Sequence, residues 1–277
     1  MKLSKKVIAA FSAAAALAVA GTFVSCSDED DDDEAGAISG SNNNYTLSYD
    51  NSGSSDGYRC YNTTTNNHLG ALCQITLNKE GTSESGAAMG LIWDLSSEDA
   101  SASAEEVARA VSAKPRNFCI ASFANSSGTF KAYVSRYTNV YDIQANNFGT
   151  KGVDVNGTTQ TAVETEYIKL SDNKILTADS NGNYAITVNV YEDHDSAGAT
   201  TGAYVVDIYN GAVEKDALES TEKLATTTIP ASDLGYGTAK KATQKPLAVY
   251  ANVYPKSTAS GTWKYVDTYS ADEVVEE

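Results

Sequence analysis

Two glutamates are the first residues whose type and spacing could support catalysis. Glu164 and Glu166 lie in the segment VETEY. Because side chains alternate along a strand, both would point from the same face. A pair of carboxylates that flank a glycosidic bond is the machinery of glycoside hydrolysis. No third acid or aromatic platform accompanies this pair, and charged side chains are rarely buried, so we interpret both as exposed residues of an edge strand.

A second acidic group could bind a metal ion. Glu192, Asp193 and Asp195 cluster in YEDHDSAG at the predicted end of a strand. Calcium prefers such oxygen ligands, but it needs about six or seven of them in one shell. Consecutive side chains point in different directions, which favours a solvated loop. No cofactor is expected, and calcium is the one ion for which the sequence offers ligands.

A polar and aromatic surface is predicted on the segment FKAYVSRYTNVY. Rings beside hydrogen-bonding groups suit a glycan, although tyrosines on a strand also form ordinary cross-strand packing pairs. The candidate ligand-binding residues are Tyr133, Arg136, Tyr137, Asn139 and Tyr141. The two tryptophans, Trp93 and Trp263, lie in apolar or late-strand segments and are predicted to be in the core.

Nucleophilic catalysis finds no support in the sequence. His68 and His194 are the only two histidines, and neither lies beside a nucleophile motif. A serine or cysteine nucleophile needs a base within hydrogen-bonding reach. We therefore expect no catalytic activity; the alternative is a carbohydrate-active enzyme whose acids cannot be paired from sequence.

The remaining chemically distinctive residue is Cys26, which lies between an apolar leader and seven consecutive acids in FVSCSDEDDDDE. Three lysines, the last of them Lys6, precede the uncharged, alanine-rich residues 7–24. That order is typical of a secretory signal. The segment Phe23-Val24-Ser25 before the cysteine resembles the lipobox of bacterial lipoproteins, which implies acylation of Cys26; the alternative is ordinary cleavage that leaves a free thiol.

Residues 26–44 are predicted to form an acidic, flexible tether. Like charges in a row repel one another and stay extended, and a Gly/Ser/Asn-rich stretch follows them. The serine and acids after Cys26 also resemble a surface-export signal of some lipoproteins, with a plain solvated spacer as the alternative. We therefore expect an exported outer-membrane lipoprotein, exposed on the surface or facing the periplasm, that is held to the membrane by acyl chains on Cys26.

Charge excludes one class of partner. Loss of residues 1–25 removes three of the 20 basic residues and none of the 36 acidic ones, which leaves a net charge of −19. Such a body repels phosphate backbones. Nucleic acid is therefore not expected as a partner, whereas a glycan or an extracellular protein is.

The residues after the tether are predicted to form strands joined by polar turns. There are four prolines and 17 tyrosines, and β-branched and aromatic residues favour strands. Strands are predicted at residues 45–49, 57–61, 70–77, 86–95, 117–123, 130–140, 165–170, 184–193, 203–211, 247–255 and 261–269. The run at 86–95, GAAMGLIWDL, is apolar throughout and suits a strand buried on both faces.

Helix signals are few. Ser103 and Glu106 form a capping box, an apolar stripe continues to Val111, and Pro115 would end the helix. The charged residues 213–224 suggest one irregular helical turn. These elements predict an all-β fold, an antiparallel two-sheet sandwich with one minor helix. The chain is thus predicted to consist of a signal peptide (residues 1–25), a tether (26–44), the sandwich domain (45–269) and an acidic tail (270–277).

Three further cysteines remain besides Cys26. An odd number allows one disulfide and one thiol. Cys119, in NFCIASF, is predicted to be buried and reduced. Cys60 and Cys73 could pair across a short loop, or Cys73 could act as a small hydrophobic residue inside a strand, and both alternatives stay open.

The order of the motifs GLIWDL, NFCIASF, GTFKAYVSRYTNV, NYAITVNVYED, GAYVVDIYNG, PLAVYANVYP and GTWKYVDTY resembles that of strands in the concanavalin A-like lectin/glucanase superfamily, including its laminin-G-like members. This resemblance implies a jelly roll with carbohydrate binding on a sheet. Glucanases of that superfamily carry an E-x-D-x-x-E strand, which this sequence lacks. The expectation is thus a non-catalytic envelope or surface protein that binds glycan or a protein partner.

Overall fold

A computed structural model describes residues 37–41, 43–83, 86–97, 111–126, 129–144, 152–153, 159–160, 162–170, 176–235 and 244–270. Nearly all secondary structure in these residues is strand. The strands are β1 (Ile38–Ser41), β2 (Asn44–Asp50), β3 (Tyr58–His68), β4 (Gly70–Leu77), β5 (Ala87–Ser97), β6 (Val111–Ser126), β7 (Thr129–Asp142), β8 (Gly152–Val153), β9 (Thr159–Gln160), β10 (Val163–Leu170), β11 (Tyr184–His194), β12 (Thr200–Asn210), β13 (Lys223–Ile229), β14 (Lys245–Val253) and β15 (Thr258–Tyr269). A 3₁₀ helix, η2, spans Lys215–Ser220.

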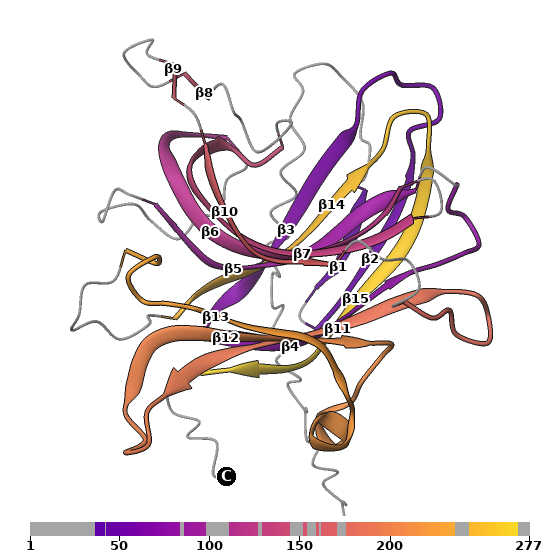
Figure 1. The fold of residues 1–277 in the computed structure, drawn as a ribbon. Helices are drawn as coiled ribbons and strands as arrows, with labels where there is room; N and C mark the ends of the chain where they lie inside the picture. Colours follow the sequence, from indigo (N-terminus) through magenta and orange to yellow (C-terminus); the bar gives the residue numbers. More distant parts are fainter. Residues whose placement is uncertain are drawn as a thin grey trace, which may run out of the picture.

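The strands form two antiparallel sheets that lie as layers one above the other (Figure 1). The seven-stranded sheet has the order β1-β2-β15-β4-β11-β12-β13, and the six-stranded sheet has the order β10-β7-β6-β5-β14-β3. β8 and β9 form a separate two-stranded ribbon. The predicted antiparallel two-sheet sandwich with one minor helix is therefore confirmed for the described residues.

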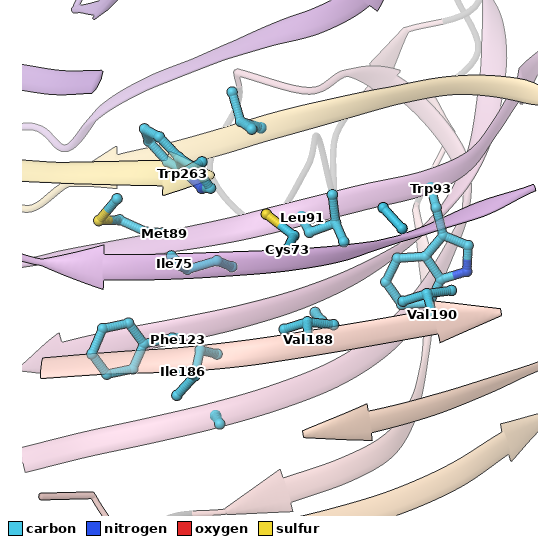
Figure 2. Close-up of a cluster of buried hydrophobic side chains, with 14 of the residues drawn as sticks. Cys73, Ile75, Met89, Leu91, Trp93, Phe123, Ile186, Val188, Val190 and Trp263 are labelled. Carbon is cyan, nitrogen blue, oxygen red and sulfur yellow. The ribbon is translucent and has the colours of Figure 1, made fainter. Parts of the chain in front are cut away.

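One hydrophobic core fills the space between the sheets (Figure 2). On β5, the alternate residues Met89, Leu91 and Trp93 point into it, as the period of two along a strand requires. On the other face of β5, Ile92 and Leu95 join a second, smaller cluster. The prediction that this strand is buried on both faces is confirmed. Partners in the core from the other sheet include Cys73, Ile75, Ile186, Val188, Val190 and Trp263.

Trp263 links the two sheets. It lies on β15 of the seven-stranded sheet with no exposed surface. Its indole Nε1–H donates a 3.0 Å hydrogen bond to the carbonyl oxygen of Gly90 on β5 of the other sheet. The predicted burial of both tryptophans, Trp93 and Trp263, is confirmed.

A buried charge cluster lies at the inner face of the six-stranded sheet. The Asp94 carboxylate has a fully buried side chain and is 2.9 Å from Arg136 Nη1 and 2.5 Å from Lys245 Nζ. Arg136 also donates to the carbonyl oxygen of Leu234 at 3.2 Å. Two cations therefore share one carboxylate, and Asp94 adopts a left-handed backbone with φ of 52°, which aspartate tolerates better than most residues.

Two predicted segments differ from the structure. The tether prediction is wrong for residues 38–41, because β1 pairs with β2 and the Ile38 side chain is buried in the core. The helix predicted from Ser103 lies mostly outside the described residues. Its predicted end is wrong, because Val111 begins β6 and Pro115 lies within that long strand. An irregular turn predicted in residues 213–224 is confirmed as η2.

The three cysteines of the body are buried and form no disulfide. The prediction for Cys119 is confirmed, and burial raises the pKa of its thiol to about 12. Cys60 on β3 and Cys73 on β4 lie in different sheets and form no disulfide. The staple between them is therefore absent.

The described residues contain no helix long and apolar enough to cross a membrane. The leader, Cys26 and the acidic run all lie outside these residues, as does the acidic tail from residue 271 onward.

Candidate functional site

An open groove crosses the outer face of the six-stranded sheet, on the side away from the core. Its volume is about 370 Å³, which is within the range of small-ligand sites. The strands β10, β7, β6, β5 and β14 form a continuous surface beneath the groove, and β3 forms its far edge. The groove is lined by Arg59, Ala88, Ile120, Ser122, Ala124, Tyr133, Ser135, Tyr137, Glu164, Glu166, Lys169, Tyr250, Asn252 and Tyr254.

The floor is low because the central strands carry small side chains there. Ala88 on β5 pairs with Ala124 on β6, and Gly90 pairs with Ser122. A Cβ built at Gly90 would lie 3.2 Å from Cδ1 of Ile120, so larger residues would crowd this floor. The hollow therefore follows from residue size at four paired positions.

Tyrosines form the two walls. Along one row of the sheet, Tyr133 pairs with Ser122, Ser122 with Gly90, and Gly90 with Tyr250. Three strand spacings separate the two tyrosine backbones by about 14 Å. The space between them is bounded by aromatic side chains and floored by small ones, which suits a flat ligand.

The β10 end of the groove is rich in hydrogen-bond acceptors. The Glu164 carboxylate accepts a 2.8 Å hydrogen bond from Ser135 Oγ. Glu166 forms a 3.3 Å ion pair with Lys169, and both side chains are about half exposed. The Lys169 ammonium also lies 5.9 Å from the centre of the Tyr133 ring. Burial and hydrogen bonding to Glu164 raise the pKa of Tyr137 above its ordinary value.

The β3 end of the groove is rich in donors. Arg59 on β3 pairs with Asn252 on β14, and its Nη1 donates to the carbonyl oxygen of Gly57 at 3.2 Å. Burial raises the pKa of Tyr254 to about 12 and that of Tyr250 as well, although Arg59 offsets part of the Tyr250 shift. Both phenols therefore keep their protons near neutral pH.

The rest of this outer face is buried. Its side chains form a second hydrophobic cluster made by Tyr61, Ile92, Leu95, Phe118, Ile120, Val140, Ile143, Ala248 and Tyr250. Beside this cluster the guanidinium of Arg116 is fully buried and donates to the carbonyl oxygen of Tyr141 at 3.0 Å. The groove is thus the open part of a face whose other part is packed.

The structure separates the five residues predicted as a ligand surface. Tyr133 and Tyr137 line the groove. Arg136 does not lie with them, because it points to the inner face and pairs with Asp94. The backbone N–H of Asn139, which has φ of 62°, donates to Asn117 Oδ1, and the Tyr141 carbonyl accepts from Arg116. Neither Asn139 nor Tyr141 lines the groove.

The acids predicted as calcium ligands have separate partners in the β11–β12 hairpin. Glu192 accepts a hydrogen bond from Thr200 Oγ1, and Asp193 accepts one from Thr201 Oγ1 at 2.8 Å. Asp195 accepts from two backbone N–H groups of its turn at 2.8 and 2.9 Å. Among the described residues no three His, Cys, Asp or Glu side chains form a group that could hold a metal ion.

Several residues of the groove could not be identified from local sequence. Arg59, Tyr250, Asn252 and Tyr254 come from strands far apart in the chain, and only the sheet order brings them beside Tyr133. The sequence around Glu164 and Glu166 does not show the tyrosines that the pairing of β10 with β7 places next to them. No local pattern reports such a pairing.

No protein-family model matches this sequence, and no curated protein matches it. Solved structures of similar shape include a legume lectin-like domain from Entamoeba histolytica, with 9% identity, 83% of this chain and 87% of that chain covered, and a TM-score of 0.36. The carbohydrate binding module CBM66 from Bacillus subtilis has 9% identity, with 82% of this chain and 86% of that chain covered, and a TM-score of 0.34. The kappa-carrageenase from Pseudoalteromonas carrageenovora has 9% identity, with 82% of each chain covered, and a TM-score of 0.32. At such scores, the sandwich assignment rests on the strand order and the core described above.

Proposed function

We propose that this protein is a lipid-anchored, non-catalytic envelope protein that binds a glycan in the groove of the six-stranded sheet. The observation that carries the proposal is the pair of tyrosine walls with polar groups between them. A sugar ring offers apolar C–H faces to aromatic rings and hydroxyls to carboxylates, amides and phenols. Pockets that combine a few convergent polar groups with apolar walls are the usual form of a ligand site.

Non-catalytic binding fits the way in which the groove carboxylates are held. Ser135 donates to Glu164, and Lys169 neutralises Glu166. In glycoside hydrolysis one carboxyl group must act as an acid and therefore keep a raised pKa. Glu166 is instead held in an ion pair with Lys169 on its own strand.

Filling the floor of the groove tests the proposal. Ala88→Leu is expected to weaken glycan binding about tenfold or more, because the added carbons occupy the space that a sugar ring would take. The full-length chain in mild detergent would first be screened on a glycan array, and the dissociation constants would then be measured by calorimetry. Ala88 faces the groove and is half-buried, so the melting temperature should change little.

A leucine on the other sheet provides the control. Thr228→Leu on β13 adds a similar side chain at an exposed position and should leave binding unchanged. A wild-type protein that binds no glycan on the array would overturn the proposal. Equal affinities for wild type and Ala88→Leu would place the binding site elsewhere.

The anchor is tested separately. Cys26→Ala is expected to move the protein from the membrane fraction to the soluble fraction, because acyl chains on that sulfur are the proposed attachment and two or more are needed for stable anchoring. Mass spectrometry of the wild-type N-terminus should detect the acyl groups. Ser27→Ala serves as a neighbouring control that keeps the cysteine. An unmodified Cys26 thiol in the wild-type protein would contradict this part of the proposal.

A carbohydrate-active enzyme is the second candidate, and one observation favours it. Glu164 and Glu166 both line the groove in which a sugar would lie. Release of reducing sugars from a polysaccharide, abolished by Glu164→Gln, would favour this candidate over simple binding.

A further inference from the structure

The two ends of the groove differ in chemistry. The β10 end presents the carboxylates Glu164 and Glu166, which accept hydrogen bonds. The opposite end presents Arg59, a permanent cation with five N–H donors. A ligand that fits both ends must itself differ along its length.

Lys169 at the β10 end does not remove the difference in charge between the two ends of the groove. Its ammonium is paired with Glu166 on the same strand, at 3.3 Å. Arg59 is the other cation that lines the groove, and it lies at the far edge of the sheet, on β3. The positive charge of the groove is therefore concentrated at the β3 end.

Phenol groups add donors near the guanidinium. Tyr250 and Tyr254 line the groove beside Asn252, which is opposite Arg59 in the register. Each phenol is protonated near neutral pH and can donate.

A buried acceptor completes this end. Asn252 Oδ1 is buried and has no hydrogen-bond partner among the described residues. A buried polar atom without a partner costs about 1–3 kcal/mol. A hydroxyl on the ligand would supply the missing bond. The β3 end of the groove therefore combines N–H and O–H donors for an oxyanion with one acceptor for a neighbouring hydroxyl.

We infer that the groove binds a glycan that carries an oxyanion, either a uronate carboxylate or a sulfate ester, with the oxyanion held by Arg59 and an adjacent hydroxyl bonded to Asn252. The inference rests on the proposed glycan-binding function and names its ligand class. Guanidinium groups bind such planar or multidentate oxyanions with paired N–H donors. The negative charge of the whole body is screened beyond about 8 Å at physiological salt, so the local cation decides binding inside the groove.

The test compares ligands that differ only in charge. Binding of an oligogalacturonate to the full-length chain would be measured by calorimetry against its methyl ester, and a sulfated carrageenan oligosaccharide against its desulfated form. At least one charged ligand is expected to bind about 10- to 100-fold more tightly than its neutral match, which is the range for a charge-assisted hydrogen bond. The pair that shows the difference identifies the oxyanion.

Substitutions at Arg59 locate the effect. Arg59→Met should bring the charged ligand down to the affinity of its neutral match, and Arg59→Lys should retain part of the difference because a lysine lacks the paired donors. Lys264→Met removes one positive charge from the opposite sheet, where Lys264 pairs with Glu214, and should leave the difference intact. If Arg59→Met fails to fold, the comparison of ligands on the wild-type protein still stands.

The outcomes separate the two proposals. Neutral glycans that bind as well as charged ones would overturn the inference and leave glycan binding in place. A charged ligand whose advantage survives Arg59→Met would also overturn it. Failure of every glycan to bind would overturn the proposed function, and the inference with it.

Discussion

Replacing Asp94 by alanine is expected to lower the free energy of unfolding by about 3–5 kcal/mol, because the change leaves two buried cations without their shared carboxylate. Arg136 and Lys245 have side chains that are only 4% and 14% exposed. The charges of both side chains are therefore largely shielded from water. Urea denaturation, followed by tryptophan fluorescence, would measure the loss, since Trp93 precedes Asp94 on the same strand.

Three further variants separate the causes. Asp94→Asn removes the charge but keeps a residue that tolerates the left-handed backbone, so it isolates the electrostatic part. Replacing Asp94, Arg136 and Lys245 together by apolar residues of similar size should recover much of the stability. Glu166→Gln breaks an exposed pair and should cost no more than about 1 kcal/mol. A loss below 1 kcal/mol for Asp94→Ala would show that the buried cluster is not structural.

Trp263→Ala is expected to destabilise the protein by about 3–5 kcal/mol, because it empties a large volume between the sheets. The indole packs in the core and bonds to the Gly90 carbonyl at 3.0 Å. Thermal and urea unfolding would measure the effect. The same variant is expected to weaken ligand binding, because Gly90 lies in the row between the two tyrosine walls.

Trp263→Phe is the matched variant. It keeps most of the ring volume but removes the N–H donor, so its expected loss is about 1–3 kcal/mol. A loss for Trp263→Ala no larger than that for Trp263→Phe would mean that the hydrogen bond, and not packing, accounts for the role of this residue.

The strands were predictable because their signal is local. Alternate side chains of β4 and of β11 face the core between the sheets, as the period of two along a strand predicts: Ala71, Cys73, Ile75 and Leu77 on β4, and Ile186, Val188 and Val190 on β11. Two strands carry weaker signals. β1 is four residues long and lies in a Gly/Ser-rich context, and β13 begins in a charged segment. Their positions in the sheet depend on pairing with β2 and β12, which the local sequence does not report.

The candidate site was predictable only in part. Tyr133 and Tyr137 were recognised from one hairpin strand, and the same alternation would have placed Arg136 on the opposite face. Arg59 and Asn252 are nearly 200 residues apart in the chain and meet because β3 pairs with β14. The small residues of the floor carry no signal of their own, since alanine, glycine and serine are common in any strand. Sheet order, a property of the whole fold, decides which of them lie together.

The position of β10 at the rim of the six-stranded sheet has a consequence for solubility. A rim strand exposes unpaired backbone groups that can recruit a strand from another molecule, and natural proteins discourage this with charged side chains. Glu164, Glu166 and Lys169 lie on this rim, while Val163 beside them is 56% exposed. Neutralising both glutamates would thus remove protection against self-association, so light scattering has to accompany any affinity measured on such a variant.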